Sequence, residues 1–290
     1  MFSLKLENKN GNIIDLNDSV KYQVWSCTGL NPPSADIFTS KSPNRKGLKY
    51  NGSTLYERNI VITIEILGDV EVNRNSLYEW IDTENYVKIH YQNGVKNVYC
   101  EGYVQDCEID LFTDKEVVSL VIICPDPYWK DLREIATEIS TLLKQFTFPF
   151  AIDAKGVPFS TIRKTNDTNI YNSGADTGCQ IKITCNGEIE NLIIYDKNDL
   201  TKQFRINTIL QQNWIVVIDT DSSPKTCKAY KPDGNIESLL KYVTGGSDGD
   251  NLPPAWFTIK KGYNTFGYYA TSGEEDVEMV ISFTNKYLGV

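Results

Sequence analysis

The sequence VVSLVIICPDPYW, residues 117–129, marks the point where one β-rich half of the chain ends. Residues 117–123 form an apolar run of strand length that is rich in β-branched side chains, which are favoured in strands. Pro125 and Pro127 then remove two backbone donors and fix φ, so neither a sheet nor a helix continues through them. We therefore predict a strand, a turn, and a connector to a second half.

The first half carries two further β signals and one helical signal. Alternating isoleucines over residues 60–67 predict a strand with one buried face. Residues 87–104 predict a β-hairpin, because they hold an Asn-Gly pair at 93–94 that suits a type I′ turn. Apolar side chains at helical spacing predict a short amphipathic helix over residues 75–83, with Asn75 or Asn73 as its N-cap.

Two stretches of the sequence are less regular. Residues 31–51 contain three prolines and several serines, so we predict a long loop, which in a compact domain is usually functional. Residues 131–143 favour a helix, because Asp131 and Glu134 resemble a capping box and apolar residues share one helical face. The alternative is an extended connector in which Ile135, Thr137 and Ile139 alternate.

The second half reads as almost wholly β, with strands separated by turn residues such as Asn186-Gly187. This pattern predicts a β-sandwich or jelly roll. We predict strands over residues 180–185, 192–195, 214–220, 226–230, 256–259, 265–270 and 277–284. The expected organisation is an N-terminal domain (1–130), a connector (131–151) and a C-terminal domain (152–290).

Composition narrows the function. The formal net charge is −9, and acidic residues outnumber basic ones in both halves, so no basic surface is expected to bind nucleic acid specifically. No apolar run approaches the ~20 residues of a membrane-spanning helix, and Lys5 and Glu7 interrupt the N-terminus too early for a signal peptide. We expect the protein to fold in the cytoplasm, without membrane insertion.

Reactive side chains do not form a recognisable catalytic or metal motif. The seven cysteines lack a Cys-x-x-Cys pair, and His90 is the single histidine, so no zinc-type cluster is predicted. We interpret the cysteines as small buried hydrophobes in a reducing compartment. No nucleophile elbow and no phosphate-binding loop is present in the sequence, so we expect no enzyme, no metal and no cofactor.

Glycine, asparagine and aromatic residues near the C-terminus suggest two structural roles. Gly262 and Asn264 are expected to adopt positive φ in a turn that joins two strands. Exposed aromatic rings can stack on sugars, although in a sandwich they more often form cross-strand pairs. Four such residues are candidates to face a glycan: Trp256, Tyr263, Tyr268 and Tyr269.

Several motifs stand in a shared order along nearly the whole chain. The turn motif comprises Cys124, Pro125, Asp126, Pro127 and Tyr128, followed by Trp129. It is preceded by residues 26–33 (SCTGLNPP) and followed by residues 172–178, residues 256–270 and the C-terminal NKYLGV of residues 285–290. In these features the chain resembles the distal tail proteins of long-tailed, siphovirus-type bacteriophages.

That resemblance implies a structural virion protein at the tail tip. The N-terminal domain, a β-sandwich or split barrel with a short helix and a hairpin, would form a hexameric ring that continues the tail tube, as the resemblance implies. The C-terminal domain would be a galectin-like or jelly-roll β-sandwich that projects outward. The implied partners are other copies of the chain, the tail tube protein, the tail-tip hub and receptor-binding proteins, while DNA passes through the channel without specific binding.

Two other functions are open at this stage. A carbohydrate-binding adhesion module would place the activity in the aromatic residues of the second half. A baseplate component of a contractile tail, or of a tail-derived bacteriocin, would do similar work in a different assembly. A wall-degrading hydrolase is disfavoured, because the acidic residues between Glu101 and Glu116 are more typical of a solvated face than of a carboxylate pair.

Overall fold

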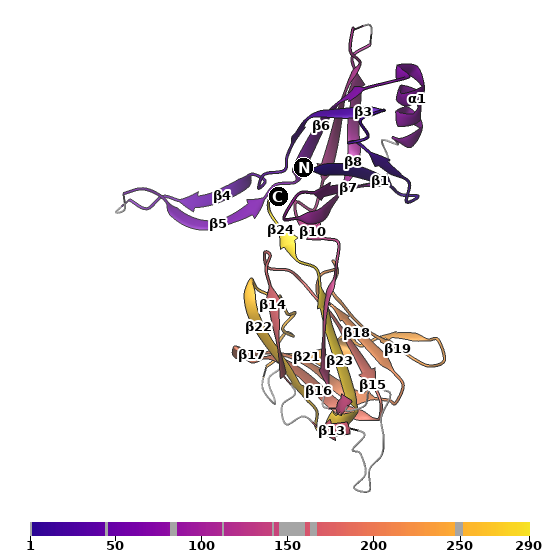
Figure 1. The fold of residues 1–290 in the computed structure, drawn as a ribbon. Coiled ribbons are helices and arrows are strands. Elements are labelled where there is room, and N and C mark those ends of the chain that lie inside the picture. The colour runs from indigo at the N-terminus through magenta and orange to yellow at the C-terminus, as the bar shows by residue number, and fades with distance from the viewer. Residues whose placement is uncertain are drawn as a thin grey trace. The chain divides into compact units, whose positions relative to one another are not determined.

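The computed structural model describes residues 2–43, 46–81, 86–111, 113–140, 142–144, 160–162, 167–246 and 252–290. The chain divides into two compact units, and it is mainly β, as predicted (Figure 1). Unit 1 contains residues 1–132 together with 286–290, and unit 2 contains residues 133–285. The chain therefore leaves unit 1 once and returns to it for its last five residues.

Unit 1 is built on a nine-stranded antiparallel sheet. Seven strands follow one path, in the order β2 (Ile13–Asp15), β1 (Ser3–Asn8), β7 (Tyr86–Gln92), β8 (Asn97–Ile109), β9 (Val117–Cys124), β6 (Arg58–Ile66) and β3 (Tyr22–Thr28). Two short strands complete the sheet, since β10 (Trp129–Asp131) pairs with β8 and with β24 (Lys286–Tyr287). The last segment of the chain is thus part of the first sheet.

Alternation along the strands forms the core of unit 1. Buried and half-buried residues alternate along β9, and Ile62 of β6 lies opposite Leu120 of β9 in an antiparallel register. Leu4 and Ile89 belong to the same buried cluster. The strand predicted over residues 60–67 is confirmed, and it begins two residues earlier, at Arg58.

The hairpin of β7 and β8 is confirmed, with His90 opposite Tyr99. Its turn differs from the prediction, because neither Asn93 nor Gly94 has a positive φ, so it is not of type I′. The Asn93 side chain closes the turn instead: Oδ1 accepts a hydrogen bond from the backbone amide of Lys96 at 2.7 Å, as short polar side chains often do in turns.

Helix α1 (Val70–Trp80) is confirmed as a short amphipathic helix, but it begins before the predicted start. Asp69 is the N-cap, and its side chain accepts a hydrogen bond from a first-turn amide, so the predicted caps Asn73 and Asn75 are wrong. Asn73 is buried on the inner face of the helix together with Leu77. The predicted last residue, Thr83, lies outside the described residues.

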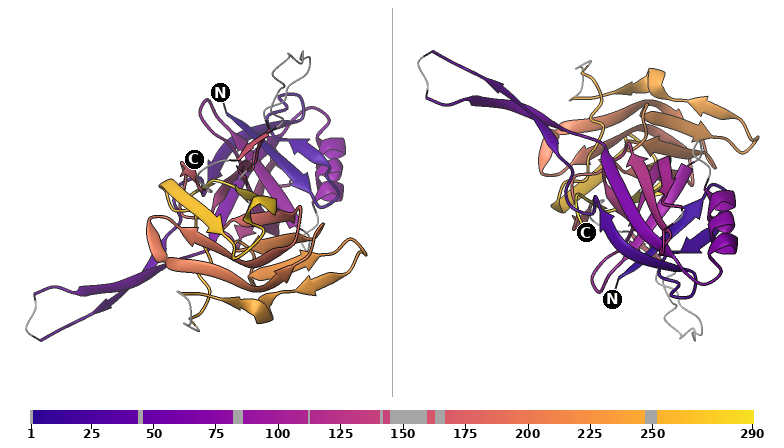
Figure 2. Two further views of the ribbon diagram at one scale, coloured as in Figure 1. Left: turned by 90° about the horizontal axis from the view of Figure 1, so that it is seen from below. Right: turned by 90° about the horizontal axis from the view of Figure 1, so that it is seen from above.

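The segment predicted as a loop over residues 31–51 contains a long hairpin, so that prediction is wrong. Strands β4 (Ala35–Ser40) and β5 (Lys49–Leu55) pair with each other and with no other described strand. They stay side by side in both views of Figure 2 and run away from the sheet of unit 1. All six residues of β4 are exposed; we call β4 and β5 the arm.

Unit 2 holds two larger antiparallel sheets and a small one. The six-stranded sheet has the order β11 (Ile135–Ser140), β23 (Val277–Phe283), β15 (Gln180–Cys185), β18 (Ile215–Asp219), β19 (Thr226–Tyr230) and β20 (Ile236–Ser238). The five-stranded sheet has the order β14 (Asp167–Asn172), β22 (Gly262–Tyr269), β16 (Ile189–Asp196), β17 (Asp199–Leu210) and β21 (Val243–Thr244). The remaining elements are β12 (Leu142–Lys144), β13 (Ser160–Ile162) and two 3-10 turns, η1 (Leu240–Tyr242) and η2 (Glu274–Asp276).

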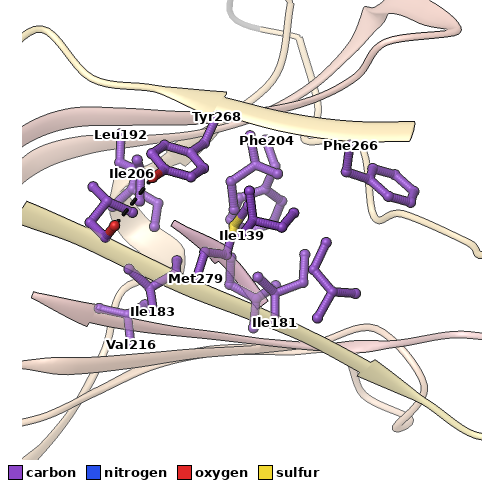
Figure 3. Packing of buried hydrophobic residues seen from close by; sticks show 14 of the residues in the cluster. Ile139, Ile181, Ile183, Leu192, Phe204, Ile206, Val216, Phe266, Tyr268 and Met279 are labelled. Atoms are coloured by element: carbon purple, nitrogen blue, oxygen red, sulfur yellow. Dashed lines mark hydrogen bonds between the residues drawn. The ribbon is translucent and has the colours of Figure 1, made fainter. Parts of the chain in front are cut away.

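One core joins the two larger sheets of unit 2. Ile181, Val216 and Met279 come from the six-stranded sheet, while Phe204 and Tyr268 come from the five-stranded sheet, and all belong to one buried cluster (Figure 3). Side chains from two facing sheets that share a core define a sandwich. The β-sandwich predicted for the second half is confirmed.

Two predictions in unit 2 are wrong. The helix favoured over residues 131–143 is absent, because residues 135–140 form β11 and pair with β23. The alternative extended reading is correct there: Ile139 is buried and Ile135 is half-buried, while Glu138 is exposed. Residues 256–259 form no strand, and Ile259 makes only an isolated bridge to Thr177.

The compact units differ from the predicted domain boundaries at both ends of unit 2. Strand β11 lies within the predicted connector but is part of a unit 2 sheet, and residues 286–290 belong to unit 1. Residues 145–151 of that connector lie outside the described residues. Among the described parts of the chain, no helix has the length and apolar character needed to cross a membrane.

Candidate functional site

Arg58, the first residue of β6, is a buried cation, with only 2% of its surface exposed. Its guanidinium donates hydrogen bonds to four backbone carbonyls: Nε to Pro127 at 2.8 Å, Nη1 to Asn31 at 2.7 Å and to Gly29, and Nη2 to Leu288 at 2.6 Å. Burial lowers the pKa of the Arg58 guanidinium, yet arginine stays protonated in proteins. Four charge-assisted hydrogen bonds offset the desolvation of the cation.

The four carbonyls come from three segments that lie far apart in the sequence. They belong to the turn after β3, to the turn after β9, and to the last three residues of the chain, 230 positions from Arg58. These are three of the segments on which the sequence resemblance rests. We call Arg58 and these three segments the junction.

Trp129 covers the guanidinium of Arg58. The Cζ atom of Arg58 lies 5.4 Å from the centroid of the indole ring, and Trp129 is fully buried. This distance is within the range of a cation–π interaction, which strengthens when the cation is desolvated. The ring of Tyr91 lies next to Trp129, with the two ring centroids 6.0 Å apart.

The C-terminal segment is held in the junction by several independent contacts. Val290 donates its backbone amide hydrogen to the Leu30 carbonyl at 3.2 Å, and Tyr287 donates its hydroxyl hydrogen to Asp131 at 2.9 Å. The Lys96 ammonium lies 3.0 Å from the centroid of the Tyr287 ring. The last residues of the chain are therefore packed into unit 1 by specific contacts.

A network of charged side chains lies next to the junction. Lys130 forms ion pairs with Glu101 at 2.8 Å and with Asp126 at 3.1 Å, and the Tyr86 hydroxyl donates to Glu101 at 2.6 Å. Burial alone would raise the pKa of the Glu101 carboxyl, but the hydrogen bonds from Lys130 and Tyr86 outweigh it and lower that pKa. The ionised carboxylate is therefore stabilised in the folded state.

The predicted turn motif has specific contacts at four of its positions. Cys124 is buried at the end of β9, and the Asp126 side chain accepts a hydrogen bond from the backbone amide of Tyr128 at 3.3 Å. Pro127 supplies a carbonyl to Arg58, while Pro125 is exposed in the turn. The sequence pointed to this turn, but it did not point to Arg58, whose only signal is a cation at the start of an apolar strand.

Gly29 and Arg58 together fix the turn that leads into the arm. Gly29 has φ of +83°, and a Cβ there would lie 2.1 Å from the carbonyl oxygen of Asn59, so no larger residue fits this close approach. The root of the arm is closed by a hydrogen bond from the Tyr56 amide to the Ser34 carbonyl at 3.0 Å. The base of the arm is thus firmly connected to the junction.

The arm itself exposes large apolar side chains. Ile37, Phe38 and Tyr50 are each about half or more exposed, at 54%, 49% and 62%, and Leu48, directly before β5, is 60% exposed. A hairpin that pairs with no other described strand also leaves both of its outer edges without backbone partners from the sheet. Such a surface is typical of a protein contact rather than of a free monomer.

A second apolar surface of unit 1 lies beside β3, an outer strand of the nine-stranded sheet. A hollow of about 230 Å³ is lined there by apolar residues that include Phe2, Val24 and Trp25. Trp25 is 51% exposed, and its indole hydrogen is donated to Glu65 at 3.0 Å. The hydrogen bond holds the ring in place, and the Lys115 ammonium lies 5.5 Å from the ring centroid.

Gly262 and Asn264 shape the start of β22 in different ways. Gly262 has φ of +96°, as predicted, whereas Asn264 does not have a positive φ, so that part of the prediction is wrong. Asn264 acts through its side chain, which donates to the Lys260 carbonyl at 2.7 Å and accepts from the Lys260 amide at 2.9 Å. The buried amide group thereby closes the turn before the strand.

The four aromatic residues predicted to face a glycan do not share one surface. Tyr268 is 1% exposed and donates its hydroxyl hydrogen to the Val277 carbonyl at 3.2 Å (Figure 3), so its assignment as glycan-facing is wrong. Trp256 is half-buried, and its ring packs edge-on against Phe204 at 5.2 Å. Tyr263 and Tyr269 are exposed, at 78% and 43%.

Groups suited to metal binding do not gather in the residues that the structure describes. No set of three or more histidine, cysteine, aspartate or glutamate side chains there could hold an ion. His90 faces Glu7 at 2.7 Å, and all seven cysteines are free thiols, five of them buried. Burial raises the pKa of the Cys185 and Cys227 thiols to about 12, which keeps these thiols protonated and unreactive at neutral pH.

Comparison with known proteins identifies the fold. No family model matches the chain, and no curated protein matches it. The SPP1 Dit protein, described as a paradigm of the hub adsorption apparatus of phages that infect Gram-positive bacteria, superimposes with a TM-score of 0.66 at 14% identity over 99% of each chain. A chain of the phage P2 baseplate, described as in its activated conformation with Ca, gives a TM-score of 0.51 at 12% identity over 100% of each chain. The chain therefore has the fold of SPP1 Dit over nearly its whole length.

Proposed function

We propose that the protein is a structural component of a phage tail tip and forms a ring at the distal end of the tail. The ring joins the tail tube to the tip hub and to the adsorption apparatus. The fold similarity to SPP1 Dit supports this proposal, since that protein is described as part of a hub adsorption apparatus. The observation that carries it is the arm, a hairpin with large exposed apolar side chains that pairs with no other described strand.

The arm suits a head-to-tail contact between copies. Ile37 and Phe38 are exposed on the arm, whereas the hollow beside Trp25 is a different apolar surface of the same unit. A contact between two different surfaces is heterologous, and it produces a closed ring when the rotation between copies closes. The six-fold stoichiometry comes from the resemblance to distal tail proteins.

The remaining roles follow from the position of such a ring. One face would meet the tail tube protein and the other the tip hub, with receptor-binding proteins attached at the periphery. DNA would pass through the channel without specific binding, because a net charge of −9 repels phosphates at long range. The protein acts by binding other proteins rather than by catalysis, and it is assembled in the host cytoplasm before it becomes part of the virion.

Negative-stain electron microscopy of the purified full-length protein tests this function, alone and mixed with purified tail tubes of the same phage. We expect closed rings with a central channel, either free or capping the ends of the tubes. Particles that remain monomeric and leave both tube ends bare at micromolar concentration would contradict the proposal.

A further inference from the structure

An exposed pair of tyrosines stands on the outer face of the five-stranded sheet of unit 2. Tyr171 on β14 and Tyr263 on β22 are directly opposite in the antiparallel register, and these two strands lie side by side in Figure 1. Their ring centroids are 5.0 Å apart with an interplanar angle of 54°, and the residues are 56% and 78% exposed. The pair forms an aromatic platform that the core does not require.

A row of polar side chains lies next to this platform, two residues before Tyr171 on β14 and two residues after Tyr263 on β22. Asn169 lies opposite Thr265, and the Thr265 hydroxyl donates to the Asn169 side-chain oxygen at 2.6 Å. In the turn between β16 and β17, the backbone amide of Lys197 donates a hydrogen bond to the Thr265 carbonyl at 2.9 Å. Thr168, Asn169, Lys197 and Thr265 line an open hollow of about 600 Å³.

A second aromatic ring bounds the row on its other side. Gly267 lies opposite Tyr195 of β16, and a Cβ on Gly267 would be 2.6 Å from the Cζ atom of the Tyr195 ring. The absence of a side chain at Gly267 therefore lets the Tyr195 ring lie flat on β22. Successive outward rows on a strand are about 7 Å apart, so the polar row has an aromatic group roughly one sugar ring away on each side.

The chemistry of this surface matches a carbohydrate. A pyranose ring has an apolar C–H face that packs on an aromatic ring and an edge of hydroxyls that both donate and accept hydrogen bonds. An amide, hydroxyls and an ammonium together supply both donors and acceptors, and specific sites combine such groups with aromatic surface. Ile193 in the neighbouring strand is only 2% exposed, so it adds no aliphatic surface beside the polar row.

We propose that this face of unit 2 binds a hexose unit of an oligosaccharide, with the ring stacked on Tyr171 and Tyr263 and its hydroxyls bonded to Asn169, Thr265 and Lys197. The site replaces the set of aromatics that the sequence suggested, of which it keeps only Tyr263. It does not depend on ring assembly, so a monomeric protein would bind the sugar equally well.

Saturation-transfer NMR on the full-length protein tests the site. The probes are methyl β-glucoside, methyl β-galactoside, methyl N-acetyl-β-glucosaminide, cellobiose and maltose, with glycerol 3-phosphate to separate anion binding from sugar binding. We expect saturable transfer to at least one sugar, and about a tenfold loss of affinity in Tyr263→Ala, the size of one lost stacking contact. Tyr263→Trp keeps an aromatic platform and should retain binding.

The matched control is Tyr230→Ala, which removes an exposed tyrosine, 40% accessible, from β19 of the other sheet. It should leave the affinity unchanged. Asn169→Ala should weaken binding without loss of the fold, because Asn169 is an exposed residue. The proposal is overturned by no transfer to any sugar from the wild-type protein, by transfer to glycerol 3-phosphate alone, or by equal binding in Tyr263→Ala and wild type.

Discussion

The junction and the arm are neighbours in the sequence and opposites in their packing. At the junction, a fully buried cation gathers the carbonyls of three distant segments. Between Asn31 and Arg58 of that junction, the arm exposes Ile37 and Phe38 to solvent on a hairpin that pairs with no other described strand. The difference indicates that the root of the arm is fixed by the fold, whereas the arm requires a partner from outside the chain.

This contrast separates stability from assembly. Residues of the junction stabilise unit 1 through buried hydrogen bonds, so their substitution should lower its unfolding free energy. Residues of the arm are already in water in the monomer, so their substitution should leave the fold intact. The following four predictions test the contrast, in order of decreasing effect on stability.

The largest effect is expected for Arg58→Met, which leaves four carbonyls of the junction without their donor. We expect unit 1 to lose about 3–5 kcal/mol of unfolding free energy, in the range for breaking a buried charged interaction. Urea unfolding followed by tryptophan fluorescence measures it. Arg74→Met, which removes a partly exposed ion pair with Glu116, should cost clearly less. Equal losses in the two variants would contradict the stabilising role assigned to the buried Arg58.

Truncation after Asn285 should have the second-largest effect. It removes the Leu288 carbonyl from Arg58 and the Val290 amide from Leu30. It also removes the Tyr287 hydroxyl from Asp131. The expected loss is about 2–3 kcal/mol, because two of these three bonds involve a charged group. Leu288→Ala keeps the backbone carbonyl and should lose less in the same urea experiment. A truncated protein as stable as the full chain would show that the C-terminal segment is only an appendage.

A smaller, pH-dependent effect is expected for Glu101→Gln. The hydrogen bonds to Lys130 and Tyr86 lower the pKa of the Glu101 carboxyl, and partial exposure limits their contribution to roughly 0.5–1 kcal/mol. Because the folded pKa lies below the unfolded value, this stabilisation is present above about pH 4.3 and is lost as the pH falls through the folded pKa.

The measurement is the difference in unfolding free energy between wild type and Glu101→Gln from pH 7 down to pH 2. We expect the difference to shrink toward zero on the acid side. Glu138→Gln is the control, since Glu138 is exposed on β11. A difference that stays constant, or that grows as the pH falls, would show that the carboxylate network does not contribute as described.

The smallest effect on stability is expected for the arm variant Ile37→Asp/Phe38→Asp. Both residues are about half exposed, so the unfolding free energy should change by less than about 0.5 kcal/mol. Thermal unfolding by circular dichroism measures this change. A marked drop in melting temperature would mean that the arm packs within its own subunit, and the distinction between the two regions would fail.

The sequence was sufficient where burial imposes a period on the side chains. The alternation over residues 60–67 predicted β6, and residues 226–230 and 277–284 predicted β19 and β23, because each strand buries one face. Alternation was absent from β4, whose residues are all exposed, so nothing in the pattern distinguished that strand from a loop. The exposure of β4 on both faces therefore explains why the sequence did not predict the arm, and the same exposure indicates that the arm contacts another protein.

Contacts between residues far apart in the sequence were the second feature that could not be predicted. A helical signal over residues 131–143 outweighed the alternation of Ile135 and Ile139, yet pairing with β23 made that segment a strand. Arg58 could not be recognised as buried, because its partners lie up to 230 residues away. Tyr268 and Tyr263 are chemically alike in the sequence, and only the register of β22 decides that one faces the core and the other faces solvent.

The most direct test of the assembly is native mass spectrometry of three full-length proteins at one concentration. They are the wild type, the arm variant Ile37→Asp/Phe38→Asp, and the control Ile236→Asp, which introduces a single aspartate at a 61% exposed position of unit 2. We predict a ring-sized oligomer for the wild type and for Ile236→Asp, and a folded monomer for the arm variant. A ring that persists in the arm variant would contradict the role of the arm.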